Sequence, residues 1–437
     1  MQTMEIHEEQ ELEKLLIRWR RDLHRFPEGG WCEFRTTAKI AEELHRLGFS
    51  LHVGEQMVHR DFIYGGPEKK RIEWHRHRAQ TQGAHPEWLG MLKECTGVTG
   101  VLNTGRPGPV RAFRFDIDAV HVSESESHEH KPFQEGFASE NVGLMHACAH
   151  DFHVALGIGL AHLLHRHRDE LDGIIKLVFQ PAEEGVRGGR AVAESGILDD
   201  VDMFFAFHVG LGYPSGTLVP GVHNFLATTK FDVHFKGRRA HAAAAPQNGA
   251  NALLASITAI QNLYVLLQHG EGRVRLNVGT LRAGEDRNVI PPSAVFEAEC
   301  RGETEKINHQ VYLRAQEIIE HAGAMHGVRS SLRVVGESLN ASSDPLLMEM
   351  VREAGEEIPW FTPLENFPHS FGGSEDCTWL MREVQKRGGL ACYGVLGADI
   401  AAGHHEETFD PDEGVLLPGV KLLFSLVQKT REAWEKS

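Results

Sequence analysis

The sequence predicts an α/β fold, a mostly parallel sheet covered by helices, into which a smaller ferredoxin-like α+β domain is inserted. In the first half of the chain, short apolar runs alternate with segments of helical spacing, as in a parallel sheet with helices on both faces. From Asn224 onward the strands instead alternate apolar and polar residues, as half-buried strands do. We therefore expect a first domain over 1–223 and 338–437 and an inserted domain over 224–337.

The first domain is expected to begin with two helices, because apolar residues recur at helical spacing and Gly48 marks an end. The stretch 52–92 is polar and charged, with a weak helical pattern, and predicts a surface insertion. The later apolar runs predict buried strands, one of which ends at Gln180-Pro181 because proline cannot donate to a sheet. In order, we expect helices over 12–26 and 36–47, a strand over 110–115, a helix over 154–167, and strands over 173–179 and 203–209.

The inserted domain is predicted from the order of its elements. Strands of period-two alternation are joined by segments of helical spacing in the order strand-helix-strand-strand-helix-strand, which is the ferredoxin-like order. The expected ranges are 228–235, 250–267, 274–281, 294–301, 307–325 and 331–335. The chain then returns to the α/β pattern.

The composition, with 41% hydrophobic and 24% charged residues, is that of a globular protein. The 61 acidic and 45 basic residues leave a net charge of −16, which argues against nucleic acid as the main partner. No apolar run has the length of a membrane span, and the polar N-terminus does not resemble a signal peptide. The six scattered cysteines are therefore expected to be reduced thiols in a cytoplasmic protein.

Four stretches carry metal-binding side chains, each at the predicted edge of a regular element. They are His146-Ala147-Cys148-Ala149-His150-Asp151, Glu183-Glu184, His208 and His404-His405. Each alone has a plainer interpretation, such as a buried thiol, a structural histidine or a solvated acidic turn. Together, the thiol, imidazoles and carboxylates suit a pair of divalent metals with a carboxylate base beside them. Asp116 and Asp118, two apart on a strand, face the same way, either as a loop-capping pair or to orient ligands.

The chain resembles the M20 metallopeptidase family, in its amidohydrolase branch with the motif HxCGHDxH, over almost its whole length. The resemblance rests on the stretches WRRDLHRFPEGGWCEFRT, LNTGRPGPVRAFRFDIDA, GLMHACAHD, KLVFQPAEEGVRGGRA, NFLATTKFD, NVGT, RNVIPPSA, GGSED and AAGHHEETFDPDE. It implies hydrolysis of an amide bond with the help of two divalent metal ions per chain, manganese or zinc.

The resemblance also implies which residues hold the metals. The bridging ligand is expected to be Cys148, with His150 and His208 at one metal and Glu184 and His405 at the other. The distance along the chain to the Phe of FDPDE favours the second histidine of the His404-His405 pair. The residues expected to orient these ligands are Asp116, Asp118 and Asp151.

Other residues are implied to act on the substrate. Glu183 is the expected general acid/base, and His241 is expected to reach the active site of a partner chain and stabilise the tetrahedral intermediate. The positions that hold the substrate's free carboxylate are matched by Asn288, Arg301 and Gly373.

The resemblance implies a small-molecule N-acyl amino acid as substrate, narrowed to glutamate joined to an aromatic acyl group. It implies a homodimer or a heteromer with a related second subunit. Three alternatives stay open: a general N-acyl-amino-acid amidohydrolase, a regulatory subunit without turnover, and a cysteine hydrolase with Cys148 as nucleophile and His150 as base. Two residues of separation is poor geometry for the cysteine hydrolase, which would also leave Glu183-Glu184 unused.

Two stretches depart from the family pattern. Ala149 and Phe152 stand where the branch has glycine, and Ala243 and Ala245 replace a glycine and a lysine near His241. Alanine at position 149 costs on the order of 1 kcal/mol if its φ is positive, and the bulk of Phe152 is expected to narrow the site. All proposed ligands are retained, so these changes bear on substrate range and rate.

Overall fold

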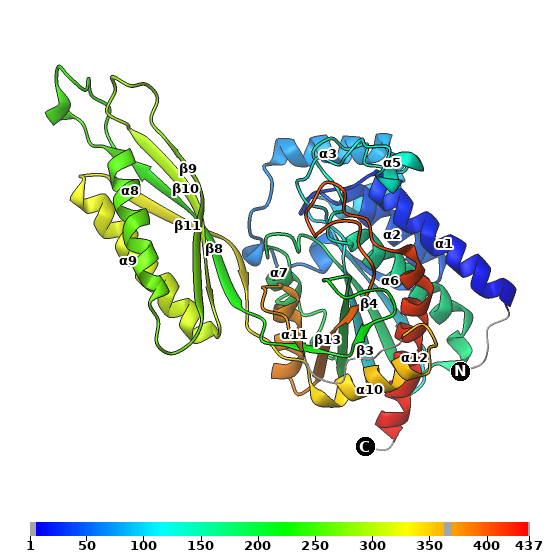
Figure 1. Cartoon of the computed structure of the whole chain (residues 1–437). Helices are drawn as coiled ribbons and strands as arrows, with labels where there is room; N and C mark the ends of the chain where they lie inside the picture. The colour runs from blue at the N-terminus through cyan, green and yellow to red at the C-terminus, as the bar shows by residue number, and fades with distance from the viewer. Residues whose placement is uncertain (1–5, 362–368, 436–437) are drawn as a thin grey trace. The chain divides into compact units, whose positions relative to one another are not determined.

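A computed structural model of the chain describes residues 6–361 and 369–435 (Figure 1). Contacts group the described residues into two compact units. The first unit takes in the described residues of 1–223, 341–371 and 377–437, and the second takes in 224–340 and 372–376. The second unit is thus inserted into the first. No helix in the described ranges is long and apolar enough to cross a membrane.

The first unit is built around a mixed sheet whose central strands are parallel. Its strands are β1 (Ser50–Val53), β2 (Val98–Asn103), β3 (Val110–Asp116), β4 (Ile174–Gln180), β5 (Met203–Val209), β6 (Leu218–Val219) and β13 (Leu390–Leu396). Among the described residues they lie in the order β1-β2-β4-β3-β5-β13-β6. The neighbours β4, β3, β5 and β13 pair in parallel, and the outer pairs are antiparallel. The predicted α/β class with a mostly parallel central sheet is confirmed.

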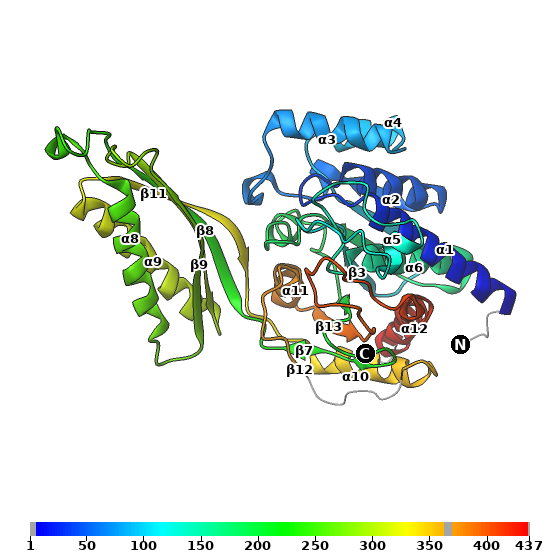
Figure 2. The same cartoon turned by 45° about the horizontal axis from the view of Figure 1, so that its top comes forward.

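Helices cover both faces of this sheet (Figure 2). The helices of the first unit are α1 (Ile6–Arg25), α2 (Phe34–Arg46), α3 (Lys69–Thr81), α4 (Pro86–Leu92), α5 (Lys131–Gln134), α6 (His150–Arg166), α7 (Gly189–Ala193), α10 (Pro345–Glu356), α11 (Cys377–Lys386) and α12 (Leu416–Glu435). On one face α6 lies against β3, β4 and β5 and contacts α1 and α12. On the other face α11 lies against β5 and β13 and contacts α7. A parallel pair, β7 (Val222–His223) and β12 (His369–Ser370), lies outside the main sheet.

Burial on both faces explains why the central strands are largely apolar. All residues of β5 are buried, and the rings of Phe113 and Phe205 stack 5.3 Å apart on neighbouring strands. Helix α6 approaches this sheet closely at Gly157, where a Cβ atom would lie 2.7 Å from the rings of Phe115 and Phe179. The helix that begins at the candidate site is therefore held firmly against the strands that end there.

Two predictions about the first unit need correction. His52 and Val53, at the start of the predicted surface insertion, belong to β1, an edge strand paired with β2. Much of the remaining stretch forms α3 and α4, and Trp88 and Leu89 join the core, because a few apolar residues on one face suffice to bury a mostly charged helix. Helix α6 begins at His150, earlier than the predicted 154, because its polar first turn hides the apolar periodicity.

The second unit has the ferredoxin-like order of elements. They are β8 (Ala227–Lys236), α8 (Ala252–Leu263), β9 (Val274–Ala283), β10 (Ser293–Gly302), α9 (Glu305–Met325) and β11 (Arg329–Ser338). The strands form an antiparallel sheet in the order β11-β8-β10-β9, with α8 and α9 packed on one face. Its core includes Phe231, Phe235 and Phe296. The other face carries polar and charged side chains, which matter below.

Candidate metal centre

The residues predicted to bind metal lie together at the carboxyl ends of the central strands of the first unit. Cys148 and His150 lie at the start of α6, Glu183 and Glu184 follow β4, His208 lies near the end of β5, and His404 and His405 lie in the loop after β13. In the sheet β5 and β13 are neighbours, and only β3 lies between β4 and β5, which is why residues so distant in sequence meet. This edge of the sheet is where ligands of α/β folds bind.

Cys148 belongs to two candidate groups of ligands. The groups whose atoms lie within 4.8 Å of one another include Cys148–His208–His404, Cys148–Glu184–His405 and His150–Glu183–Glu184. Sγ of Cys148 lies 3.6 Å from Nε2 of His208 and 3.6 Å from Nδ1 of His404. A sulfur shared by two groups is in the position of a bridging ligand.

Backbone carbonyls select the ligand tautomer of two of the predicted ligands. Nδ1 of His208 donates to the carbonyl of Val209 at 2.8 Å, and Nδ1 of His150 donates to the carbonyl of Asp118 at 2.8 Å. In its neutral form each ring therefore presents an unprotonated Nε2, as a metal-binding imidazole does. Nε2 of His150 is buried and makes no hydrogen bond with the described residues.

The donor set fits divalent cations. Oε1 of Glu184 lies 3.2 Å from Nε2 of His405 but makes no hydrogen bond with the described residues, so its lone pairs stay available. Contacts with Cys148 and Glu184 raise the pKa of His405 to about 10. Burial alone would lower the pKa of His150, but the charge of Asp116 and the contacts with Asp118 and Cys148 together outweigh burial and hold that pKa well above its usual value. The surroundings of His150 and His405 thus favour positive charge, which a divalent metal supplies.

The thiol of Cys148 is not set up as a nucleophile. Burial, followed by the negative charge of Glu184, raises its pKa. A reactive cysteine needs the opposite, a pKa lowered by cationic neighbours. The environment therefore argues against a cysteine hydrolase, whereas a bound cation would stabilise the thiolate directly.

His404 also faces Cys148, although the sequence prediction set it aside. Its Nε2 accepts the backbone N–H of Leu211 at 3.1 Å. Burial, followed by the charge of His405, lowers the pKa of His404 to about 4, so the ring is neutral near pH 7. The ring proton then sits on Nδ1, the atom that faces the sulfur. In this tautomer His404 is oriented to donate to the thiolate.

Two buried carboxylates hold the turn that carries Glu183 and Glu184. The carboxylate of Asp118 accepts the backbone N–H of Glu183 and that of Glu184, each at 3.0 Å. Oε1 of Glu33 accepts the N–H of Ala182 at 2.7 Å. Burial, followed by the charge of Asp118, raises the pKa of Glu33 to about 8. The sequence indicated Asp118 but not Glu33, which lies 149 positions before Ala182.

The other two predicted orienting residues are also buried and paired. Asp116 forms a short hydrogen bond with Nδ1 of His153 and an ion pair with Arg114 at 2.6 Å. Nε2 of His153 accepts the N–H of Val209, which ties α6 to the end of β5. His153 and Glu33 were not predicted, whereas His404 was set aside in favour of His405.

Asp151 lies in the first turn of α6. Its Oδ2 is 2.9 Å from Nδ1 of His24 and 3.1 Å from Nε of Arg20. Burial would raise the pKa of Asp151, but the charge of Arg20 and the bond from His24 outweigh it and lower that pKa. The carboxylate therefore anchors the start of α6, next to Cys148 and His150, to helix α1.

The departures from the family pattern have structural consequences. Ala149 has φ +64°, the left-handed region, so the strain anticipated for an alanine there is present. His405 and Ala182 also have positive φ, +66° and +54°, so backbone strain recurs around the centre. The ring of Phe152 does not narrow the site; it is fully buried in the core, 4.8 Å from the guanidinium of Arg20.

Two predicted residues lie together in the second unit. His241 is exposed, and its Nδ1 accepts the N–H groups of Ala243 and Ala244 at 3.2 and 3.1 Å. In the neutral ring the proton is therefore on Nε2, ready to be donated to an external oxygen. The carbonyl of Asn288 accepts the N–H of Ala242 at 2.9 Å, so Asn288 adjoins the His241 loop.

The predicted carboxylate-binding residues do not all meet. Arg301 lines a cavity of about 360 Å³ on the second unit, together with Gly372, next to Gly373 in the chain. The carbonyl of Gly373 accepts the N–H of Leu226, another lining residue, at 2.8 Å. Asn288 is not among the described residues that line this cavity.

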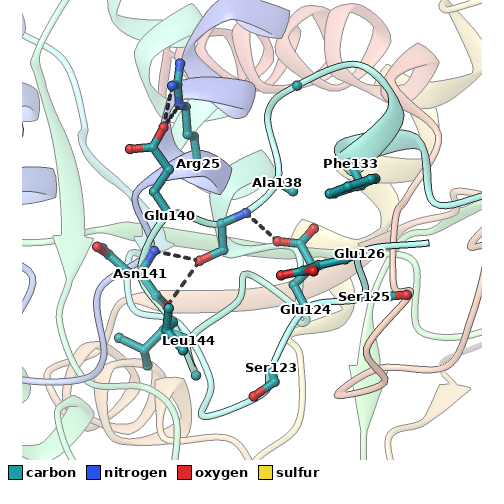
Figure 3. A pocket seen from close by; sticks show the side chains of 14 residues that line it. Arg25, Ser123, Glu124, Ser125, Glu126, Phe133, Ala138, Glu140, Asn141 and Leu144 are labelled. Atoms are coloured by element: carbon teal, nitrogen blue, oxygen red, sulfur yellow. Dashed lines mark hydrogen bonds and ion pairs between the residues drawn. The ribbon is translucent and has the colours of Figure 1, made fainter. Parts of the chain in front are cut away.

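Another cavity, of about 350 Å³, lies in the first unit and contains none of the predicted site residues (Figure 3). Three of its charged groups, Arg25, Glu124 and Glu140, are already paired. Oε1 of Glu140 accepts from Nε of Arg25 at 2.6 Å, and Oε2 of Glu124 accepts the N–H of Ser139 at 2.5 Å. Oε1 of Glu124 also contacts two buried histidines, His24 and His130. These pairs stabilise the surrounding loops.

Comparison with known proteins gives consistent matches. The profile of peptidase family M20/M25/M40 matches residues 112–429. Indole-3-acetyl-aspartic acid hydrolase from Enterobacter agglomerans is 46% identical over 93% of this chain and 94% of its own. One of the subunits of p-aminobenzoyl-glutamate hydrolase from Escherichia coli (strain K12) is likewise 46% identical over 93% of this chain and 94% of its own.

Solved structures agree. An aminobenzoyl-glutamate utilization protein from Klebsiella pneumoniae matches with a TM-score of 0.82 and 38% identity over 97% of each chain. A dinuclear metal-binding M20 peptidase from Bacillus subtilis matches with a TM-score of 0.67 and 25% identity, over 97% of this chain and 99% of its own. Together with the ligand groups described above, the second match supports two divalent metals in this chain.

Proposed function

This chain belongs to the peptidase family M20/M25/M40 and is a hydrolase, and we propose that it cleaves the amide bond of an N-acylated acidic amino acid. The substrate we expect is p-aminobenzoyl-glutamate, which water would split into p-aminobenzoate and glutamate. The observation that carries the proposal is the sulfur of Cys148 shared by two ligand groups, with Glu183 beside them.

The two relatives of highest identity given above support an acidic amino acid in the substrate. One is named for an aspartic acid conjugate and the other for a glutamate conjugate. Their acyl groups differ, indole-acetyl in one and aminobenzoyl in the other, whereas both amino acids carry a second carboxylate. A general acyl-amino-acid amidohydrolase is the weaker alternative, because N-acetyl-L-cysteine deacetylase from Bacillus subtilis (strain 168) is only 28% identical.

We propose that Cys148 bridges the two metals, with His150 and His208 at one and Glu184 and His405 at the other. When bound there, the metals would lower the pKa of a water molecule towards neutrality and polarise the amide carbonyl. Thiolate favours zinc, while imidazole and carboxylate also accept manganese.

Two side chains would handle protons and charge. The carboxylate of Glu183 would take a proton from the attacking water and pass it to the nitrogen of the leaving amine. The products are then the free acid and the free amine. Nε2–H of His241 would donate to the carbonyl oxygen as negative charge develops on it. The preset tautomer of His241 supports this role. The free carboxylate of the substrate would bind Arg301.

We also propose a homodimer or a heteromer with a related chain, because the Escherichia coli relative is named as one subunit of its hydrolase. Two features of the second unit support such an assembly. Strand β9 lies at the edge of its sheet, where it can pair with another strand. In the segment before β9, large apolar side chains are exposed and could be covered by a partner, namely Ile257, Val265 and Leu267. A cytoplasmic location, supported by six free thiols, remains part of the proposal.

The test is turnover by the purified single chain, supplied with manganese or zinc and p-aminobenzoyl-glutamate. We expect Glu183→Gln to abolish release of p-aminobenzoate while two metals per chain are retained, because glutamine keeps the shape but cannot carry the proton. Metal analysis and the assay are made on the same sample. Loss of metal from Glu183→Gln would show that Glu183 is a ligand and that the roles of Glu183 and Glu184 are reversed. Glu184→Gln is the matched variant, which is expected to lose metal.

The same assay separates the alternatives. A cysteine hydrolase would keep its activity in the presence of a chelator, whereas the proposed enzyme loses it. A regulatory subunit would bind metal without turnover until its catalytic partner is added. Equal cleavage of aliphatic acyl-amino acids would indicate a general amidohydrolase.

A further inference from the structure

The open face of the second unit's sheet carries a cluster of arginines in a chain whose net charge is −16. The cavity of about 360 Å³ is lined by Leu226, Arg273, Arg275, Leu276, Asn277, Glu299, Arg301 and Gly372. Three of these side chains are cations and one is an anion, so the lining has a surplus of positive charge. Of the residues that line this cavity, Arg301 alone was predicted from the sequence to bind a substrate carboxylate.

Strand register places the central pair. Arg275 on β9 lies directly opposite Arg301 on β10, and Asn277 lies opposite Glu299. Residues two apart share one face, so all four side chains leave the sheet on the same side. The residues between them, Leu276 and Cys300, are buried in the core on the other side.

The two arginines differ in how they are neutralised. Nε and Nη2 of Arg301 both lie 2.9 Å from Oε1 of Glu299. Arg275 donates to the carbonyl of Val274 at 3.0 Å and has no carboxylate partner among the described residues. Like charges directly opposite on neighbouring strands destabilise a sheet, and a bound anion between them would remove that cost. Arg301 keeps further N–H groups free for such an anion, because guanidinium donates in several directions.

We propose that Arg275 and Arg301 together form a pocket for two carboxylates, in which Arg301 binds the α-carboxylate and Arg275 binds the side-chain carboxylate of an acidic amino acid. Asn277 adds a neutral hydrogen-bonding group beside Arg275. The inference rests on the proposed function and deepens it, because it explains by charge why aspartate or glutamate, rather than any amino acid, is the amine product. Neutral amino acids would leave the guanidinium of Arg275 without its anion.

The experiment compares matched substrates with matched variants. The substrates are p-aminobenzoyl-glutamate, p-aminobenzoyl-glutamine, which lacks only the side-chain charge, and the α-amide of p-aminobenzoyl-glutamate, which lacks only the α-charge. The variants are Arg275→Gln, Arg301→Gln and, as a control, Arg282→Gln, an exposed arginine on the same strand β9 outside the cavity.

Arg275→Gln is expected to lower kcat/KM for the glutamate substrate by between about 10- and 150-fold, the range for a hydrogen bond to a charged group. The glutamine substrate should be almost unaffected, so the preference for glutamate collapses. Arg301→Gln should likewise lower kcat/KM for p-aminobenzoyl-glutamate, but it should leave kcat/KM for the α-amide almost unaffected. Arg282→Gln should change kcat/KM for none of these substrates. Equal losses for glutamate and glutamine substrates in Arg275→Gln, or an unchanged preference, would overturn the pocket.

Binding of small acids distinguishes failure of the pocket from failure of the proposed function. Titration calorimetry on the full chain compares glutarate, with two carboxylates, and its half-amide glutaramate, with one. If no aroyl-amino acid is cleaved but glutarate binds more tightly in an Arg275-dependent manner, the pocket stands and the proposed substrate is wrong. If turnover occurs without any dependence on Arg275, the proposed function stands and the pocket is wrong. If glutarate and glutaramate bind alike and no substrate is cleaved, both are wrong.

Discussion

His404 and His405 are neighbours in the chain but differ in what their rings can offer at Cys148. Nε2 of His404 is occupied by the N–H of Leu211, which leaves a protonated Nδ1 facing the sulfur. His405 instead presents Nε2 to Glu184 at 3.2 Å. A backbone amide therefore separates two chemically identical side chains into a hydrogen-bond donor and a candidate ligand.

This distinction makes a prediction about metal content. His404→Gln should weaken metal binding by roughly 10- to 100-fold, the usual effect of losing a partner that orients or supports a ligand, yet keep two metals per chain at saturation. His405→Gln should bind only one metal per chain at saturation. Competition with a chelator gives the affinity, and elemental analysis gives the stoichiometry. A drop to one metal in His404→Gln would make His404 a ligand.

At the scale of elements, the turn after β4 depends on residues that meet only in the fold. The central strands and the ferredoxin-like order follow from apolar periodicity. For the same reason the segments carrying Glu184 and His208 could be assigned to strand ends, and the segment carrying Cys148 to the start of a helix. Glu33 could not be found in this way, because its contact with Ala182 spans 149 positions and leaves no local pattern. The edge strand β1 was missed because a short, half-exposed strand has too few apolar residues to show alternation.

Glu33 makes the stability of this turn dependent on pH. Its pKa is raised from 4.5 to about 8 by burial and by Asp118, so the folded state favours the protonated carboxyl. Its contribution is fully present below pH 4.5 and is lost as the pH rises through about 8. Glu33→Gln removes this dependence, because an amide does not ionise. The amide can still accept from the N–H of Ala182 and donate to the hydroxyl of Thr96, so both present contacts are kept.

We therefore expect Glu33→Gln to gain stability relative to the parent as pH rises from 4.5 to 8, by up to about 1.4 kcal/mol per pH unit. Urea unfolding of both proteins in the presence of a chelator measures the difference. Glu13→Gln, at an exposed position of α1, is the matched control. A pH-independent difference would mean that Glu33 is ionised in the folded protein throughout this range.

At the scale of the whole molecule, the groups proposed for catalysis are divided between two units. The candidate metal ligands and Glu183 belong to the first unit, whereas His241 and Arg301 belong to the second. In the neutral form of the exposed His241 ring, the two backbone amides that donate to Nδ1 leave the proton on Nε2, and no described residue offers that N–H an oxygen acceptor. Such a donor fits a substrate oxygen, and the proposed dimer lets each copy supply it to the other.

Mixing two inactive variants tests this exchange. One variant, Glu183→Gln, keeps His241, and the other, His241→Ala, keeps Glu183. If His241 serves the neighbouring copy, a mixed dimer has one site with both groups intact, and random exchange of chains should restore about one quarter of the parental activity. Native mass spectrometry of differently tagged chains establishes that exchange has occurred. If mixed dimers form and stay inactive, His241 acts within its own chain. A His241→Ala chain that keeps its activity by itself would show that His241 has no part in the reaction.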